Sequence, residues 1–192
     1  NLVVEYGFNI VGVKNIIDNK SSPKFNEVYS SIFFSRLFLF LVGLIIFAVL
    51  ILSIPKFRAD SLLYFASYSL ILTNIVVPMW FYQAVEKMKY ISLINTISKL
   101  ISTVLVFVLI KEISDVMWVP LIYTFSSLMV GIISYIILLK SFNVKLEIKY
   151  CSWDQIKNYL QQGWHYFISN ISISLYTTTL PVLLGIFGTK EQ

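Results

Sequence analysis

Long runs of hydrophobic residues, separated by short polar segments, follow one another along the chain. A helix that spans a bilayer needs about 20 mostly apolar residues, and five runs approach this length: Leu37–Ser53, Leu62–Tyr82, Ile91–Ile110, Val116–Leu139 and Trp164–Gly188. A sixth run, Leu2–Ile17, is shorter and fits either the end of a membrane helix or an interfacial helix. The runs lack the period-two alternation of barrel strands. The pattern therefore predicts an all-α, polytopic transmembrane helix bundle of about six spans.

Composition excludes the ordinary soluble classes of protein. Hydrophobic residues make up 57% of the chain and charged residues 13%, against roughly 25% charged residues in soluble domains, so neither a soluble monomer nor a disordered chain fits. The single cysteine, Cys151, excludes a disulfide framework, and the single histidine, His165, argues against a histidine-rich metal centre. The sequence contains no phosphate-binding loop, serine-hydrolase or metalloprotease motif. We expect no enzyme activity, no metal and no cofactor.

Basic residues are distributed unequally between alternate loops. The loops on one side of the predicted bundle hold ten Lys and Arg residues, and those on the other side hold four. The richer side should be cytoplasmic, because cytoplasmic loops of membrane proteins carry an excess of positive charge. This bias and contacts with anionic membrane lipids account for the net charge of +5. Nucleic acid is therefore not expected as a partner.

The longest loop, Lys140–Gly163, contains the start of a further helix. Ser152 and Gln155 match a capping box, and hydrophobic residues recur at helical spacing after them. This pattern predicts a short helix that lies along the cytoplasmic interface. The chain lacks an initiator methionine and opens inside a hydrophobic run, so we interpret it as an internal fragment of a longer membrane protein.

One helical face of the run Ile91–Ile110 is polar. Its members recur three and four residues apart: Ser92, Asn95, Thr96, Lys99, Ser102 and Thr103. Lys99 lies near the middle of the run, where a charge costs at least about 2.5–3.5 kcal/mol on insertion scales. It therefore either faces a polar cavity or is held in a structural ion pair. Glu5, about 13 Å from Lys14 along its helix, is the candidate partner, or else a carboxylate that couples transport to a cation.

Other runs carry milder polar stripes, which either pack helices together or line a polar interior. The cavity candidates in the second and fourth runs are Tyr64, Tyr68, Asn74 and Tyr123. Pro78 lies inside the second run, where it permits a bend. Arg36 precedes the run Leu37–Ser53 at its cytoplasmic edge, where it either binds phosphate bidentately or extends its charge to the lipid headgroups.

A sequence motif at the end of the second run suggests a family. Its positions follow the pattern P-x-W-x-x-Q-x-x-E-x-M-x-x-x-x-x-x-N-x-x-x-K, with the family-motif residues Pro78, Trp80, Gln83 and Glu86 and with Met88, Asn95 and Lys99 after them. The opening Glu5-Tyr-Gly-Phe and the segment Gly163-Trp-His-Tyr-Phe-Ile-Ser add weaker similarity. Together these segments resemble bacterial O-antigen and polysaccharide flippases, which belong to the exporter superfamily that also contains multidrug and toxin extrusion proteins.

The resemblance implies a twelve-helix fold in two six-helix halves. Residues 1–139 would then hold the second to sixth helices of the N-terminal bundle. Residues 140–163 would form the cytoplasmic linker, and residues 164–192 the first helix of the C-terminal bundle. The implied location is the bacterial inner membrane, with a polysaccharide polymerase and chain-length machinery as possible partners.

The resemblance also implies a substrate and a mechanism. The substrate would be an undecaprenyl-pyrophosphate-linked oligosaccharide, moved across the membrane by alternating access with a proton or sodium as coupling ion. Lys99 or Arg36 would hold the phosphates. Tyrosine rings would stack on sugars, and the polar residues Ser92, Asn95 and Asn74 would complete the cavity.

Three other classes remain open. A drug or cation exporter of the same superfamily would favour acidic cavity residues, and the mid-span charges Glu5 and Lys99 do not decide between it and a flippase. A non-transporting membrane scaffold would have tightly packed polar stripes and no cavity. A membrane glycosyltransferase or polymerase would need charged clusters in a large outer loop, whereas every loop on the predicted outer side is short.

Overall fold

The computed structural model describes residues 1–18, 22–58 and 60–187, and this part of the chain is built from helices without strands. Four of its segments are long and apolar enough to cross a membrane: Lys24–Ser53, Ser61–Ala84, Met88–Leu109 and Asp115–Phe142. The prediction of an all-α polytopic bundle is confirmed. The elements in chain order are α1 (Leu2–Glu5), α2 (Phe8–Asp18), α3 (Ser22–Ser53), α4 (Pro55–Arg58), α5 (Ser61–Ser69), α6 (Leu72–Val76), α7 (Met79–Ala84), α8 (Met88–Leu109), the 3-10 helix η1 (Ile113–Trp118), α9 (Val119–Phe142), the 3-10 turn η2 (Ile148–Tyr150) and α10 (Trp153–Phe187).

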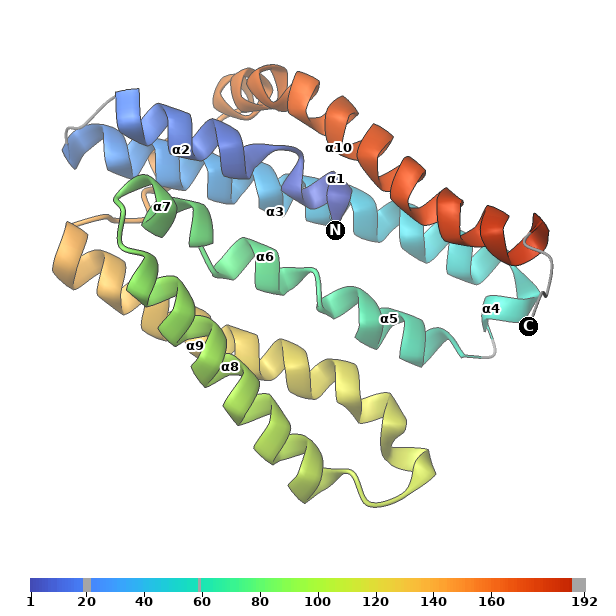
Figure 1. The fold of residues 1–192 in the computed structure, drawn as a ribbon. Coiled ribbons are helices and arrows are strands. Elements are labelled where there is room, and N and C mark those ends of the chain that lie inside the picture. The colour runs from blue at the N-terminus through green and yellow to red at the C-terminus, as the bar shows by residue number, and fades with distance from the viewer. Residues whose placement is uncertain (19–21, 59, 188–192) are drawn as a thin grey trace.

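The long helices form two groups with a broken helix between them (Figure 1). Helices α3 and α10 pack side by side in one group, and α8 and α9 form an antiparallel hairpin in the other. The segments α5, α6 and α7 run between the groups, with α6 against α9 and α7 against α2. The chain reverses direction from one long helix to the next, as the short loops predict.

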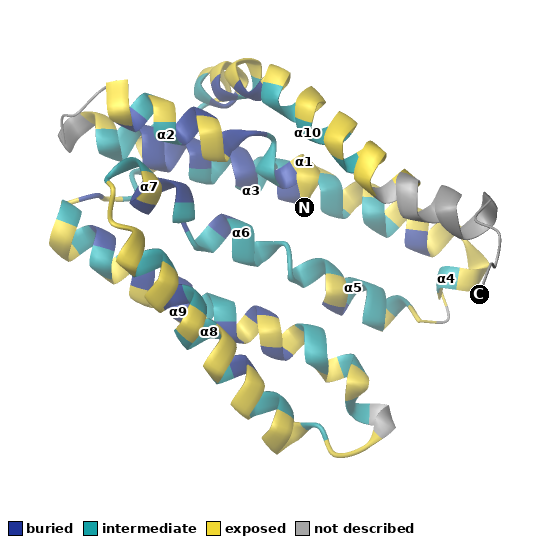
Figure 2. Cartoon of the chain, viewed as in Figure 1, coloured by how far each residue is buried: buried dark blue, intermediate teal, exposed yellow. Residues whose placement is uncertain are grey.

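Buried residues gather at the predicted cytoplasmic end, where α2, α3 and α7 meet, whereas α8 and α10 expose much of their surface (Figure 2). The core at this end is aromatic, with Trp80, Phe81 and Tyr82 of α7 all buried. A Cβ atom on Gly12 would lie 2.4 Å from the Trp80 ring, so only glycine lets α2 approach the indole this closely. The Tyr82 hydroxyl is within 2.9 Å of Ser134 Oγ on α9. These contacts anchor α7 to its neighbours.

The second predicted span differs most from expectation. The run Leu62–Tyr82 is not one regular helix. Leu70 and Ile71 keep helical φ and ψ angles but bond to carbonyls three residues back, and the chain leaves helical geometry at Val77 and Pro78. Val77 is extended, with φ −98° and ψ 104°, as expected for a residue before proline. The bend permitted by Pro78 is therefore a full break.

Helix α3 begins fifteen residues before the predicted start at Leu37 and continues to Ser53. Arg36 consequently lies about 18 Å along the helix from Lys24, within the candidate span Lys24–Ser53. The predicted start of this helix at Leu37 is wrong, and the position of Arg36 relative to the membrane boundary stays a prediction. The polar residues before Leu37 are accommodated because Ser30, Ser31 and Ser35 are buried against other helices rather than facing lipid.

The predicted short surface helix starts where expected but does not end before the next span. The Gln155 main-chain N–H donates to Ser152 Oγ at 3.3 Å, and α10 then continues to Phe187. Gly163 lies within this helix, where a Cβ would come within 2.6 Å of the Tyr6 carbonyl. Tyr6 and Gly7 adopt positive φ angles of 41° and 79° and separate α1 from α2. The break between α1 and α2 therefore packs directly on the glycine of α10.

Candidate functional site

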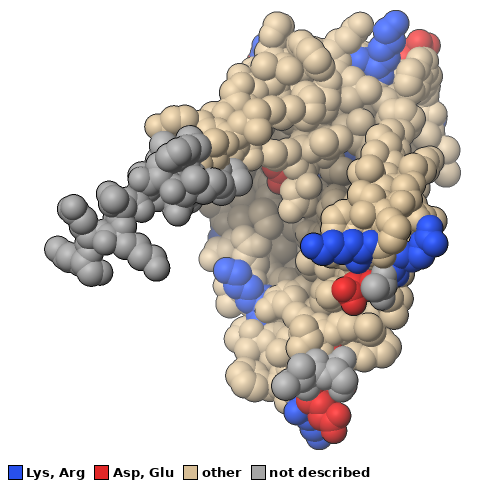
Figure 3. Space-filling model, turned by 90° about the vertical axis from the view of Figure 1, so that its right-hand side faces the viewer, with Lys and Arg blue, Asp and Glu red and all other residues tan. Residues whose placement is uncertain are grey.

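A polar cavity of about 210 Å³ lies where the two helix groups and the broken helix meet. Its walls come from α1, α2, α3, α6, α7, α8 and α9, and the residues that line it are Glu5, Asn9, Arg36, Thr73, Asn74, Val77, Met79, Ile94, Asn95, Ser98 and Ser127. Figure 3 views the molecule from the end where α3 and the α8–α9 hairpin finish, and it shows a hollow with an acidic side chain in its wall and basic side chains near its rim. Seven helical elements thus contribute to one shared polar interior.

Arg36 is the cation of this cavity. Its side chain is 2% exposed, and Nη1 donates to the main-chain carbonyl of Asn74 at 2.6 Å while Nη2 donates to Asn9 Oδ1 at 2.8 Å. The side chain therefore points inward and does not extend to the lipid headgroups, which excludes one of the two alternatives left by the sequence. A charge at this depth is tolerated because strong hydrogen bonds and nearby polar groups replace its water.

The carbonyl that Arg36 engages is one that the helix itself leaves free. In an α-helix the Asn74 carbonyl would accept a hydrogen bond from the N–H of residue 78, but Pro78 has no N–H. The Val77 N–H donates instead to the Thr73 carbonyl at 3.1 Å. The Arg36 guanidinium thus supplies the donor that the proline removes.

One nitrogen of Arg36 has no partner. Within the described residues, Nε is buried and unpaired. Glu5 also lines the cavity, and its carboxylate is close enough to act electrostatically on the Arg36 charge, yet no ion pair joins the two in the described part of the chain. The cavity therefore contains one acid and one base that are near each other without direct contact.

Helices α8 and α9 supply the wall opposite Arg36. Asn95 and Ser98 come from α8, and Ser127 comes from α9. Ser98 lies ten residues, about 15 Å, after Met88 at the start of α8. A distance of this size places the polar wall near the middle of a 30 Å hydrocarbon layer, about half of its depth.

Of the predicted cavity residues, the structure brings Arg36, Asn74, Asn95 and Glu5 together. Lys99 and Ser92 do not line this cavity; both are exposed on α8. Within the described residues Lys99 forms no ion pair with Glu5. The cation that the structure places in the cavity is thus Arg36, and a role for Lys99 in binding phosphate stays a prediction.

The predicted tyrosines lie outside this cavity as well. Tyr68 donates to the Phe40 carbonyl at 2.8 Å and stacks on Phe47, so it joins α5 to α3. Tyr64 packs edge-on against Phe57 of α4, and Tyr123 is exposed on α9. Their proposed stacking on sugar rings stays a prediction.

The family-motif residues divide between the core and the surface. Pro78 and Trp80 are buried, and Pro78 forms the break beside the cavity. Gln83 is exposed in a groove that it shares with Lys14 and other residues of α2. Glu86 adopts a left-handed φ of 57° in the turn before α8. The motif residues therefore form a helix break at Pro78, a buried contact at Trp80 and a tight turn at Glu86 more than they form a ligand site.

Sequence reasoning missed several cavity residues. Asn9 lies four residues after Glu5 and contacts Arg36. This spacing of four residues was the sequence signal that could have identified Asn9 as a cavity residue, although the break at Gly7 interrupts the helix between Glu5 and Asn9. Ser98 lies on the edge of the polar face of α8, beside the stripe that contains Lys99. Ser98 and Lys99 are about 100° apart around the helix, so the rotation of α8 relative to its neighbours decides which of them reaches the cavity.

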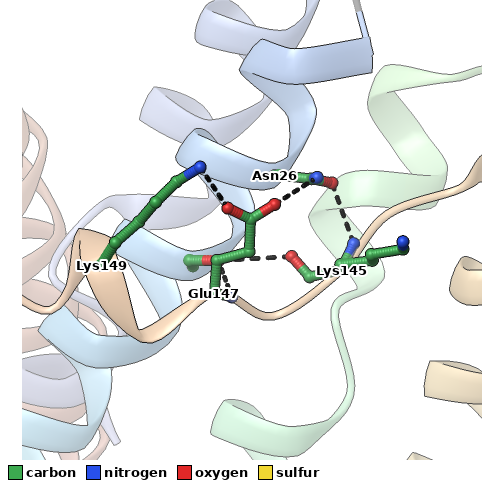
Figure 4. Close-up of polar contacts among 5 residues, drawn as sticks. Asn26, Lys145, Glu147 and Lys149 are labelled. Carbon is green, nitrogen blue, oxygen red and sulfur yellow. Dashed lines mark hydrogen bonds and ion pairs between the residues drawn. The ribbon is translucent and has the colours of Figure 1, made fainter.

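A second polar cluster joins α3 to the segment between α9 and α10 (Figure 4). Asn26 donates from Nδ2 to Glu147 Oε1 at 2.8 Å and accepts from the Lys145 main-chain N–H at 2.9 Å. The Glu147 N–H donates to Ser30 Oγ at 2.9 Å, and Lys149 Nζ lies 2.5 Å from Glu147 Oε2. We call these five residues the linker clamp. Lys149 and Asn26 stabilise the carboxylate and hold the pKa of Glu147 below its ordinary value.

The described residues contain no group of three or more His, Cys, Asp or Glu side chains that could hold a metal. The cavity instead offers one guanidinium, one carboxylate, three amides and several hydroxyls. Such a set offers hydrogen-bond donors and acceptors to a polar or charged ligand.

Comparisons with known proteins agree with this picture. The chain is 28% identical over 96% of its length to an Escherichia coli K12 protein named "Putative O-antigen transporter", covering 44% of that protein. It is also 28% identical over 98% of its length to a Shigella dysenteriae protein of the same name, covering 47% of it. The chain thus spans less than half the length of these relatives. No solved structure matches it significantly.

The spanning segments and these relatives together make the chain part of a multi-pass protein of the bacterial inner membrane. The family model described as "Polysaccharide biosynthesis protein" matches residues 1–191, which is nearly the whole chain. The motif resemblance noted in the sequence is therefore confirmed. The chain belongs to this polysaccharide biosynthesis protein family.

Proposed function

We propose that the whole protein is a flippase that carries undecaprenyl-pyrophosphate-linked polysaccharide repeat units across the inner membrane by alternating access. Family membership and the printed names of the relatives support a transporter of polysaccharide precursors. The observation that carries the proposal is Arg36, a buried guanidinium in a polar cavity inside the membrane-spanning region. Such a residue is the expected partner of a phosphate that has left water.

The size of the cavity limits what it holds. Its volume of about 210 Å³ is smaller than the roughly 300–1,000 Å³ of pockets that bind drug-sized ligands. It suits a phosphate group, whereas an oligosaccharide needs more space. We infer that the phosphates bind near Arg36 and that the sugars occupy space bounded by the rest of the protein, since this chain spans less than half of its relatives.

Complementation tests the proposal. A flippase-deficient bacterium would receive the full-length gene together with the matching glycan gene cluster, and surface polysaccharide would be measured on gels. We expect restoration by the unaltered gene and by Arg58→Gln, and loss with Arg36→Gln at equal protein levels in the membrane. Arg58 is the matched control, because it is an exposed arginine at the outer end of α3. Equal activity of the two variants would contradict the role given to Arg36.

A drug or cation exporter of the same superfamily is the second candidate, and Glu5 in the cavity wall favours it. In that case the carboxylate would hold the cationic substrate, and Arg36 would regulate its charge. The same strains decide between the candidates. A Glu5→Gln variant that sensitises cells to cationic dyes and leaves surface polysaccharide intact would support the exporter.

A non-transporting scaffold is less consistent with the structure. The polar faces of α3, α6 and α8 line a shared cavity, whereas a scaffold would have them packed tightly against one another.

A further inference from the structure

Arg36 has two roles in the structure. It lies in the cavity wall, and it donates a hydrogen bond to the Asn74 carbonyl at the break in the second span. We propose that Arg36 links occupancy of the cavity to the shape of this break, because a phosphate that binds the guanidinium draws it away from the Asn74 carbonyl and releases the end of α6 from α3. This inference rests on the proposed function for the nature of the ligand. It adds a route by which ligand binding changes the conformation of the protein.

The hydrogen bonds of Arg36 support such an exchange. Nη1 and Nη2 are already engaged by the Asn74 carbonyl and by Asn9, and Nε is shut off from solvent. A guanidinium carries five N–H groups, so one N–H on each of Nη1 and Nη2 is left for a phosphate, and an anion bound there competes with the Asn74 carbonyl and with Asn9 for the position of the guanidinium. The phosphate is itself charged, whereas the two oxygen acceptors are neutral, so it attracts the guanidinium more strongly than they do.

The Asn74 carbonyl lacks the main-chain donor that a regular helix would supply. Pro78 cannot supply the N–H, and the Val77 N–H is already bonded to Thr73. A carbonyl left unpaired away from water is unfavourable. Once Arg36 leaves, the segment has to rearrange until the Asn74 carbonyl finds another partner. The present geometry is thus stable with Arg36 in place and unstable without it.

The two sides of the break differ in how firmly they are held. On one side, α7 is anchored by Trp80 against Gly12 and by the Tyr82 hydroxyl on Ser134. On the other side, α6 is only five residues long and follows a stretch at Leu70 and Ile71 whose N–H groups bond to carbonyls three residues back instead of four. Rearrangement should therefore move α6 and α5 while α7 stays fixed.

Movement of α6 would be passed on to the α8–α9 hairpin. Val76 of α6 packs so closely on Gly131 that a Cβ there would lie 2.2 Å from Val76 Cγ1. Since the contact leaves no free space, α9 has to follow α6 or separate from it. Phosphate binding at Arg36 would in this way reach the helix hairpin that forms the opposite cavity wall.

Distances between spin labels test the coupling. The labels would be placed at Ser67 on α5 and Gln83 on α7, both exposed, in full-length protein without other cysteines, reconstituted in lipid nanodiscs. The probes are inorganic pyrophosphate and geranylgeranyl pyrophosphate, which separate free phosphate from a lipid headgroup as the source. A control pair at Met88 on α8 and Ser141 on α9, both exposed, should show no change in distance, because α8 and α9 pack against each other as one hairpin.

We expect saturating probe to shift the Ser67–Gln83 distance distribution of the unaltered protein by several ångströms. The Pro78→Ala variant restores an N–H for the Asn74 carbonyl, so it should bind the probe and lose most of the shift. Arg36→Lys keeps the charge but cannot make both hydrogen bonds, so it should show the shifted distribution without probe. This second variant keeps the test decisive if Pro78→Ala fails to fold.

The outcomes separate the two proposals. Binding of either probe without any shift in the unaltered protein overturns the coupling and leaves the proposed function standing. A shift of unchanged size in Pro78→Ala, or an Arg36→Lys distribution identical to that of the unaltered protein, also overturns it. Absence of binding by both probes contradicts the phosphate site itself, and with it both proposals.

Discussion

Arg36 on α3 donates from Nη1 to the main-chain carbonyl of Asn74 on α6 at 2.6 Å, four residues before Pro78. Proline creates an unpaired carbonyl in a membrane-spanning segment, and a buried guanidinium needs acceptors to replace its water. Arg36 thus supplies the donor that the Asn74 carbonyl lacks, and this carbonyl supplies an acceptor for the buried guanidinium. The pair also places a positive charge beside Glu5 and Asn95 in the same cavity, so the break and the charged site form one structural unit.

Loss of Arg36 should lower the free energy of unfolding of the protein, independently of any effect on transport. Arg36→Gln leaves the Asn74 carbonyl and Asn9 without a donor, and each buried acceptor left unpaired costs about 1–3 kcal/mol. Relief from burying a charge offsets part of this, so we expect a net loss of about 1–3 kcal/mol. Thermal unfolding of the full-length protein in detergent would measure it.

Arg58 provides the comparison for that measurement. It is exposed, and its guanidinium bonds the Leu52 carbonyl at the end of α3. Arg58→Gln should change the free energy of unfolding by no more than about 0.5 kcal/mol, as most surface substitutions do. Equal losses in the two variants would show that burial of Arg36 does not carry the energy assigned to it.

Close packing of α6 on α9 depends on Gly131. An added Cβ would lie 2.2 Å from Val76 Cγ1, so Gly131→Ala should cost about 1–3 kcal/mol through overpacking. Val76→Ala removes the clashing methyl groups, and the double variant should recover most of this loss. Additive effects in a double-mutant cycle would contradict direct contact between the two positions.

The sequence predicted the helical class, the position of α8 and a bend at Pro78, because hydrophobic run length and proline chemistry are local properties. It placed the start of the first long helix too late, because the polar residues that precede Leu37 hide the true start of α3 at Ser22. Serines on a buried face look like a loop in a hydropathy pattern. Only packing against other helices shows that they belong to the span.

The cavity was harder to predict than the helices. Asn95 and Ser98 share one wall with Lys99 only one residue farther along α8, and the sequence gives the polar face without its rotation relative to neighbours. Rotation is set by contacts between helices far apart in the chain, such as α8 on α9. Periodicity alone therefore could not identify which basic residue lines the cavity.

The linker clamp should depend on pH through Glu147. Its pKa is lowered by Lys149 and Asn26 in the folded state, so the carboxylate contributes stability above the ordinary value of 4.5, and this contribution disappears as pH falls through the lowered folded value. Glu147→Gln should lower the melting temperature at pH 7, and the difference from the unaltered protein should shrink as pH falls below 4.5 toward the lowered folded pKa.

Lys145→Gln is the control for the clamp. Lys145 takes part through its main-chain N–H, which donates to Asn26, so this substitution keeps the hydrogen bonds and should keep the pH dependence. Full-length protein in detergent, melted at several pH values, provides the measurement. A melting difference between Glu147→Gln and the unaltered protein that does not shrink at any pH below 4.5 at which the protein stays folded would rule out ionisation of Glu147 as the source.

Lys99 is exposed at mid-span on α8, and its ammonium would cost at least about 2.5–3.5 kcal/mol if it faced lipid. It lies four residues after Asn95, which lines the cavity, and therefore on a neighbouring part of the same helical face, so we expect it to meet water or substrate in the full-length protein. In membranes, Lys99→Cys should react with a water-soluble thiol reagent at least about ten times faster than Leu100→Cys, because the polar face of α8 would be wet and the apolar face would be in lipid.

Polysaccharide export should respond to the same residue. Lys99→Ala should reduce surface polysaccharide while the protein still inserts, because a cation near the cavity is lost, and Leu100→Ala should leave it unchanged. The two assays distinguish different failures. Fast labelling with normal polysaccharide would place Lys99 at the water-filled surface but outside the transport mechanism. Slow labelling at both positions would mean that the face of α8 carrying Lys99 is covered by lipid or by tightly packed protein, so that the water-accessible cavity is confined to the wall formed by Asn95 and Ser98.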